Sequence, residues 1–127
     1  MIVADSDVLI DALRGRQPMR DRIAVELRGG ALATTVINLF ELLAGARTAA
    51  ERAKVEKLLG ALTILPLDEA AARQGATIRR TLEAAGQTIG MADSLIAGLC
   101  IVRGAILLTR NRALFEWVEG LVLAGEG

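Results

Sequence analysis

Short apolar runs alternate along this chain with longer segments in which apolar residues recur at helical spacing. The short runs carry no charge, which is typical of strands buried on both faces of a parallel sheet. Strands are predicted over residues 2–4, 31–34, 62–65, 105–108 and 121–123, and helices over 6–13, 18–28, 36–46, 69–84, 91–102 and 111–117. This alternation predicts an α/β fold, an α/β/α sandwich with a mostly parallel central sheet of about five strands.

Capping signals mark the starts of further helical segments. Thr48 followed by Glu51 has the spacing of a capping box, so another helix is predicted after Thr48. Asp68 is predicted to cap the long helix over 69–84. In the helix over 36–46, the apolar residues expected to face the core are Leu39, Phe40, Leu42 and Leu43.

The composition removes several kinds of chemistry. The chain has no His and no Tyr, so it can build neither a Ser–His or Cys–His nucleophile nor a His-ligated zinc site. The single cysteine, Cys100, lies in an apolar run and is interpreted as a core residue, as are Phe115 and Trp117. One cysteine cannot form an internal disulfide, which fits a reducing, cytoplasmic setting.

The length and hydrophobicity indicate one packed unit. A chain of 127 residues suits a single domain, predicted to span residues 1–127. Hydrophobic residues make up 53% of it, enough for a real core and for an apolar surface that a partner would cover. No continuous apolar run reaches the length of about 20 residues that a membrane helix needs, and Asp5 lies too early for a signal peptide.

Three carboxylates lie in surroundings where charges are otherwise missing. Asp5 ends the apolar opening stretch, Glu41 is the only charge between Gly30 and Arg47, and Asp93 is the only charge in a second long apolar segment. An unpaired buried carboxylate costs several kcal/mol, so it must be neutralised, paired or bound to a metal. If the fold brings the three together, a divalent cation is the simplest compensating charge.

Several polar residues fall where predicted strands end. In α/β sheets, ligand sites lie beyond the carboxyl ends of the strands. Asp5, the Thr34–Thr35 pair and Thr109 all lie at such ends, and Asn111 follows two residues after Thr109. Each also has a structural interpretation: Asp5 as the cap of the helix over 6–13, and Thr109 and Asn111 as caps of the last short helix.

Other polar groups near these positions have open interpretations. Asn38 lies one turn before Glu41, either as a neighbour of a metal site or as a buried amide with its hydrogen bonds satisfied. Asp7 and Asp11 are interpreted as a solvated face or as acids favoured by the start of their helix.

The charges balance overall, with 15 basic and 15 acidic residues. A nucleic-acid partner would therefore need a local basic patch. Arginines cluster after the first predicted helix, beginning at Arg14, while Arg110 and Arg112 flank Asn111. These three arginines are candidate contacts for substrate phosphates, although a solvated face would explain them as well.

Taken in order, these segments resemble the PIN-domain nucleases, especially the VapC-like toxins of bacterial toxin–antitoxin pairs. The resemblance covers essentially the whole chain and includes a connector at residues 64–68. Its four motifs are Ile2-Val3-Ala4-Asp5-Ser6-Asp7-Val8, Thr35-Val36-Ile37-Asn38-Leu39-Phe40-Glu41-Leu42, Asp93-Ser94-Leu95-Ile96-Ala97, and Leu107-Leu108-Thr109-Arg110-Asn111 leading to Phe115.

The resemblance implies a metal-dependent endoribonuclease that hydrolyses single-stranded or looped RNA. Asp5, Glu41 and Asp93 would be the acidic ligands of Mg²⁺ or Mn²⁺. The fourth motif departs from the usual pattern because many relatives carry an acid where this chain has Asn111, so Asn111 or Thr109 would serve as a neutral ligand or orient a water. The resemblance also implies a cytoplasmic homodimer and a cognate antitoxin that covers the active site.

Other function classes stay open at this point. An apolar strand followed by Asp5 and Asp7 also resembles the start of haloacid-dehalogenase-type phosphatases, although the chain is short for that group. A response-regulator receiver domain would need an acid at the end of the strand over 62–65, where the sequence is apolar until Asp68. A non-catalytic module that binds RNA or protein is the third possibility, and three intact carboxylates argue against it.

Overall fold

Seven helices and five strands alternate along residues 1–125, the part of the chain that the computed structural model describes. The strands are β1 (Ile2–Ala4), β2 (Leu32–Thr35), β3 (Thr63–Leu65), β4 (Ile106–Leu108) and β5 (Val122–Leu123). The helices are α1 (Ser6–Leu13), α2 (Met19–Gly29), α3 (Val36–Gly45), α4 (Ala49–Gly60), α5 (Glu69–Ala84), α6 (Met91–Arg103) and α7 (Arg112–Phe115). The predicted elements are therefore all present, with ends that differ by a few residues at most.

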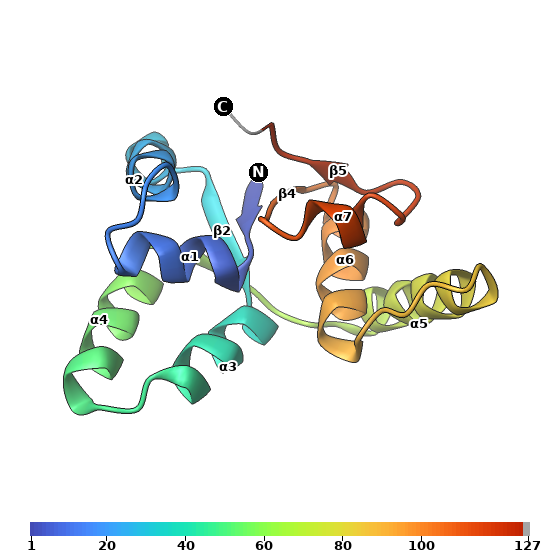
Figure 1. The fold of residues 1–127 in the computed structure, drawn as a ribbon, viewed down its shortest axis with the longest axis horizontal. Coiled ribbons are helices and arrows are strands. Elements are labelled where there is room, and N and C mark those ends of the chain that lie inside the picture. The colour runs from blue at the N-terminus through green and yellow to red at the C-terminus, as the bar shows by residue number, and fades with distance from the viewer. Residues whose placement is uncertain (126–127) are drawn as a thin grey trace.

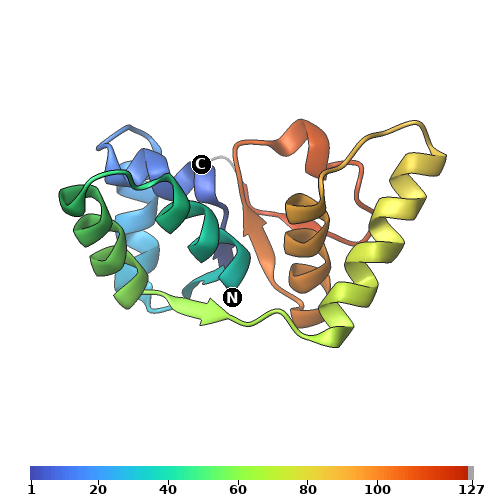
Figure 2. The same ribbon diagram turned by 90° about the horizontal axis from the view of Figure 1, so that it is seen from below.

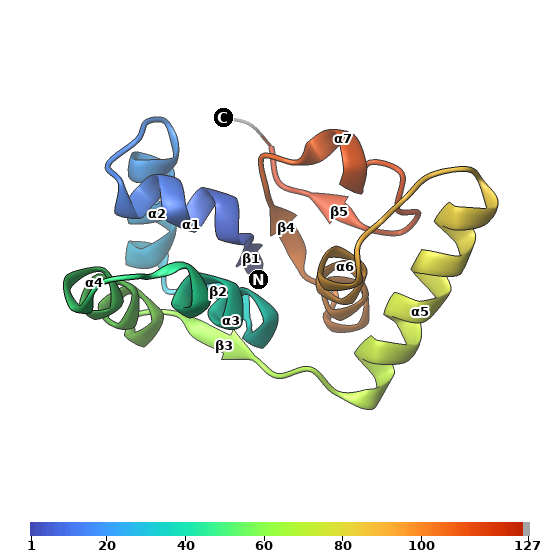
Figure 3. The same cartoon turned by 60° about the horizontal axis from the view of Figure 1, so that its bottom comes forward.

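All five strands run parallel in the order β3-β2-β1-β4-β5 (Figure 1; all five are labelled in Figure 3). The central strand β1 pairs with β2 through Ile2 and Leu32, and with β4 through Ile2 and Ile106. Because the pairs are parallel, the carboxyl ends of β1, β2 and β4 meet at one edge of the sheet. This edge is the position at which the sequence predicts the functional residues.

Two hydrophobic clusters cover the two faces of the sheet, as the α/β/α prediction requires. One contains Val3 of β1 with residues of α5 and α6, and the other contains Ala4 with residues of α1, α2 and α4. Successive strand residues thus point to opposite faces. Helix α3 packs into both clusters, through Ile37 and through Leu42, so it lies at the boundary of the two layers (Figure 2).

Helices α5 and α6 pack closely along one side of the molecule (Figure 3). Gly98 of α6 faces Gly75 of α5, and a Cβ atom at Gly98 would lie 2.6 Å from the Gly75 backbone nitrogen. The glycine at this position permits that approach, so the backbones of α6 and α5 pack directly against each other. Cys100, two residues later, is fully buried as predicted, and burial raises the pKa of its thiol to about 12.

Two aromatic residues do not lie where the sequence predicts. Phe40 is 70% exposed because Asn38 and Leu42, one turn apart, face inward and Phe40 lies on the opposite side of α3. Phe115 is fully buried, but Trp117 comes after the end of α7 and is 55% exposed. Among residues 1–125, none of the helices is both long and apolar enough to cross a bilayer.

Candidate active site

The site begins where β1 ends. Asp5 follows β1 directly, and its backbone N–H donates to the Leu108 carbonyl of β4 at 2.9 Å. Thr109, the next residue after β4, is therefore brought beside Asp5 at the carboxyl edge of the sheet. Both side chains are buried, with Asp5 only 7% exposed.

Three neutral donors hold the Asp5 carboxylate. Ser6 N and Asn38 Nδ2 donate to Oδ1 at 2.8 and 3.0 Å, and Thr109 Oγ1 donates to Oδ2 at 2.8 Å. The first of these bonds caps α1, so the structural and the functional interpretations of Asp5 are compatible. Among the described residues, no Lys or Arg forms an ion pair with Asp5.

Glu41 joins Asp5 through the start of α3. Thr35 caps this helix: its hydroxyl accepts from Asn38 N at 3.2 Å and donates to Asn38 Oδ1 at 2.7 Å. These bonds leave the amide nitrogen of Asn38 directed toward the end of β1. That nitrogen donates to Asp5 and, at 2.9 Å, to Ser6 Oγ. Ser6 Oγ in turn donates to Glu41 Oε1 at 2.8 Å. Asn38 is thus both a satisfied buried amide and a direct neighbour of the acids.

Asp93 approaches the same group of acids from the first turn of α6. Gly90, rather than Asp93, precedes the helix as its cap, as the sequence predicts. Burial raises the pKa of Asp93 to about 6, and the negative charges of Asp5, Glu41 and Asp7 contribute to this rise. The side chain has no hydrogen bond and no cationic partner within the described chain. Its charge is therefore uncompensated by the protein.

Asp7 is half-buried beside Asp5 rather than fully solvated, and it lies in the first turn of α1, as its second interpretation predicts. The Arg110 backbone N–H donates to its carboxylate, at 3.1 Å to Oδ2 and 3.3 Å to Oδ1. Thr109 Oγ1 lies 3.4 Å from Asp7 Oδ2. Burial and the charge of Asp5 raise the pKa of Asp7, in spite of the Arg110 N–H, which lowers it. The partner of Asp7 is 103 residues away in the chain, so no local pattern could have indicated it.

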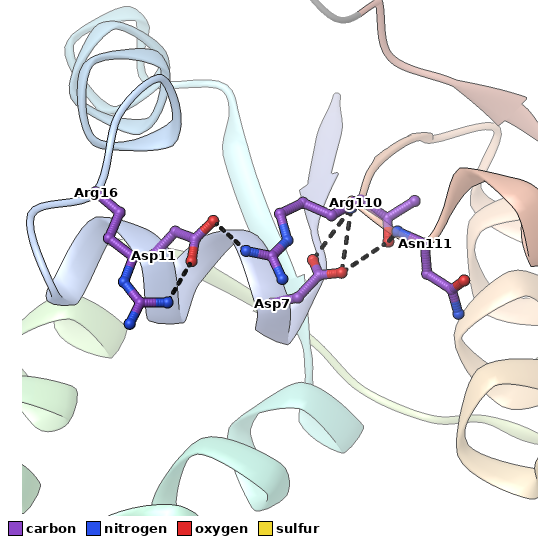
Figure 4. Close-up of polar contacts among 6 residues, drawn as sticks. Asp7, Asp11, Arg16, Arg110 and Asn111 are labelled. Atoms are coloured by element: carbon purple, nitrogen blue, oxygen red, sulfur yellow. Dashed lines mark hydrogen bonds and ion pairs between the residues drawn. The ribbon is translucent and has the colours of Figure 1, made fainter.

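Asp11 is also buried rather than solvated, one turn after Asp7 on α1. Its carboxylate accepts from Arg110 Nη1 at 2.7 Å and lies 3.9 Å from Arg16 Nη1 (Figure 4). The Arg110 side chain is therefore engaged with Asp11. Arg112 donates to the Ala124 carbonyl at 2.5 Å, which ties α7 to the end of β5.

Thr109 and Asn111 have different environments. Thr109 Oγ1 donates to Asp5 and accepts from Asn111 N at 3.1 Å, so its hydroxyl positions the carboxylate. The Asn111 side chain is exposed, forms no capping hydrogen bond to α7, and points away from the Asp7 carboxylate (Figure 4).

The acids fit a hard divalent cation in their chemistry. Asp5, Glu41 and Asp93 offer carboxylate oxygens with no competing cation of the described chain, and oxygen is the ligand atom that such ions prefer. Across residues 1–125, no three acidic side chains are already arranged around one point as a metal cage. Carboxylates that repel one another do not converge by themselves, and Mg²⁺ typically takes only one or two of them together with waters.

The chain is similar over most of its length to a family of known proteins. Residues 2–120 match the PIN domain. Ribonuclease VapC10 of Mycobacterium tuberculosis is 38% identical over 121 residues, covering 95% of this chain and 90% of the relative. The tRNA(fMet)-specific endonuclease VapC of Shigella flexneri is 32% identical and covers 92% and 91%. The crystal structure of DNA-bound VapBC from Salmonella typhimurium superposes with a TM-score of 0.84 at 26% identity, covering 97% of this chain and 96% of that one.

Proposed function

This chain belongs to the PIN-domain family, and from that premise we propose that it is an endoribonuclease and the toxin of a toxin–antitoxin pair. The resemblance carried by the four sequence motifs is confirmed by the family match. Because that match extends over nearly the whole chain, we set aside the phosphatase and receiver-domain hypotheses. The substrate class is single-stranded or looped RNA, whose phosphodiester bonds the enzyme hydrolyses.

PIN-domain nucleases generally use a divalent metal ion, and the ion proposed here is Mg²⁺ or Mn²⁺. Asp5, Glu41 and Asp93 would hold it. When bound, such an ion supplies a water of lowered pKa and neutralises charge on phosphate oxygens. The observation that carries this proposal is that neutral donors alone hold Asp5 and Glu41, that the negative charges of both act on Asp93, and that no cation of the described chain is paired with any of the three.

The protein's own contribution is to fix the acids before substrate arrives. Asn38 and Ser6 hold Asp5 and Glu41 in one hydrogen-bonded chain, and Thr109 holds the second oxygen of Asp5. Such positioning groups around metal ligands commonly change activity 10–100-fold when they are removed (roughly,). Because the chain has no His, the base would be either a carboxylate, for which we propose Asp5 or Asp93, or hydroxide held by the metal ion.

The proposed partners follow from the family. We infer a cognate antitoxin and a homodimer, and we propose that the pair acts in the cytoplasm. The aromatic side chains of Phe40 and Trp117 are both exposed and so are accessible to such contacts.

The proposal is tested by incubating the purified protein with a mixed pool of single-stranded RNA in Mg²⁺, in Mn²⁺ and in EDTA. We expect cleavage only with metal, products with a 5′-phosphate, and loss of cleavage in Asp93→Asn. Asp21→Asn, which removes an acid from the first turn of α2, is the matched control and should cleave normally. Metal-independent cleavage, or products that carry a 2′,3′-cyclic phosphate, would contradict the proposal.

A further inference from the structure

A cavity of about 310 Å³ opens beside Glu41, between α1, α3 and α4. Its floor is apolar and is formed by Ile10, Leu13, Leu42 and Val55. Glu41 belongs both to this cavity and to the acid site, since its carboxylate accepts from Ser6. A ligand in the cavity would therefore lie next to the reacting phosphodiester. The volume is at the lower end of the range of small-ligand pockets.

Two cations line the same cavity. Arg14 ends α1 and Lys54 lies in α4, and both side chains are exposed. Within residues 1–125, neither side chain forms a hydrogen bond or an ion pair, in contrast to Arg110, which is engaged with Asp11. The other two charged groups of the wall are acids: Glu41 accepts a hydrogen bond from Ser6 Oγ at 2.8 Å, and Glu51 accepts one from the Arg47 backbone N–H at 2.9 Å. The two cations are thus the groups available to an anionic ligand.

Resting on the proposed function, we propose that this cavity is a subsite for an RNA nucleotide flanking the scissile phosphodiester. The apolar floor takes the base, and Arg14 and Lys54 contact the neighbouring phosphates. Bases have apolar faces and phosphates are anions, so a cavity whose lining joins apolar side chains to the two cations Arg14 and Lys54 can take a single-stranded nucleotide. An acidic site needs such cations nearby, because the carboxylates themselves repel the RNA backbone.

The salt dependence of RNA binding gives the sharpest test. Binding of a short, fluorescein-labelled single-stranded RNA of mixed sequence is measured in EDTA by fluorescence anisotropy at several salt concentrations. Each lost phosphate contact should reduce the slope of log K against log salt by about 0.7. We expect this reduction, with a several-fold weaker Kd, for Arg14→Gln and for Lys54→Gln, and about twice the reduction for the double variant. Lys57→Gln, on the same helix but outside the cavity, is the matched control and should change neither.

The apolar floor is tested separately. Ala46 lines the cavity in extended backbone, where Leu is tolerated, so Ala46→Leu should fill the space without removing a charge. We expect a several-fold higher KM in metal-dependent cleavage, an unchanged kcat and an unchanged salt slope. A thermal midpoint equal to that of the wild type shows that the variant is folded.

The outcomes separate this inference from the proposed function. If the wild type cleaves RNA with metal but the double variant matches Lys57→Gln in slope, Kd and KM, the nuclease proposal stands and the subsite is refuted. If the double variant keeps its RNA affinity and instead loses a co-expressed antitoxin, the cavity is a protein-docking site and the inference is overturned. If the wild type neither binds nor cleaves RNA, both proposals fail.

Discussion

Replacing Asp93 by Asn should stabilise the metal-free protein although it removes a proposed metal ligand. Burial, together with the charges of Asp5, Glu41 and Asp7, raises the pKa of Asp93 from 3.8 to about 6. Within the described chain, no hydrogen bond or ion pair offsets the cost of ionising this carboxyl group. Asn keeps the shape of the side chain and removes the charge.

The sign and size of the effect follow from proton linkage. The native protein binds the Asp93 proton more tightly than the unfolded chain does, so the free energy of unfolding falls as pH rises from about 3.8 to about 6. Above about pH 6 the native state bears the full free-energy cost of ionising Asp93. A rise of about two pKa units corresponds to ~3 kcal/mol. Asp93 is partly exposed, so solvent screens much of this cost of ionisation, and the start of α6 further favours a negative charge. We therefore expect Asp93→Asn to raise the free energy of unfolding by about 1 kcal/mol.

Urea unfolding followed by circular dichroism measures this difference. In EDTA at pH 8, Asp93→Asn should be more stable than the wild type by about 1 kcal/mol, and the gain should vanish near pH 3, below the pKa of the unfolded chain. Asp21→Asn removes an acid from the start of α2 and should give no gain. A variant that is no more stable than the wild type at pH 8, or a gain that persists in full at pH 3, would refute the argument.

Metal should reverse the order of stability. A divalent ion at 100 times its Kd stabilises the native wild type by about 2.7 kcal/mol. Asp93→Asn, which lacks a proposed ligand, should gain much less under the same conditions. An equal gain in both proteins would show that Asp93 is not a ligand of the ion.

Three further predictions concern the surroundings of the site. Thr109→Val removes the hydroxyl that holds the carboxylate after β1 and should cost about 1–2 kcal/mol of stability and roughly 10–100-fold in RNA cleavage, while Thr109→Ser should restore both. Gly98→Ala places a methyl group 2.6 Å from the backbone of α5 and should destabilise the protein by roughly 2–3 kcal/mol in urea, whereas Gly60→Ala, with no neighbour within 4 Å, should not. Arg110→Gln leaves buried Asp11 without its 2.7 Å partner, so the thermal midpoint should fall more clearly than RNA affinity does.

The arrangement of the elements could be predicted because local pattern and global fold agree. Each short apolar run became a strand, and Gly90, Thr48 and Asp68 precede the helices they were expected to cap. In a parallel sheet all carboxyl ends lie on one edge, so Asp5 and Thr109, 104 residues apart, could be placed on that edge from the sequence. Their direct contact depends on the pairing of β1 with β4, which the sequence pattern does not specify.

The direction of individual side chains could not be predicted in the same way. Phe40 and Leu42 are both apolar, so their hydrophobicity does not indicate which of them faces the core. The inward position of Asn38 decides it, because Leu42 lies one turn after Asn38 on the same side of α3 and Phe40 lies on the other side. Asp7 and Asp11 have the sequence appearance of surface acids. Their partner, Arg110, comes from a loop about 100 residues away, so its effect depends on tertiary contacts that no window of sequence contains.

These distant contacts also explain how an acidic site can keep its negative charge. Arg110 follows shortly after β4, close to the acids. Its guanidinium is nevertheless bound to Asp11, one turn of α1 beyond Asp7. Only its backbone N–H reaches Asp7. Asp5 and Glu41 are held instead by hydroxyl, amide and backbone donors, which orient carboxylates without neutralising them. An arginine paired directly to these acids would stabilise the empty site and compete with a divalent ion for it. The fold therefore accepts a less stable metal-free state, and the same repulsion that raises the pKa of Asp93 favours binding of a cation.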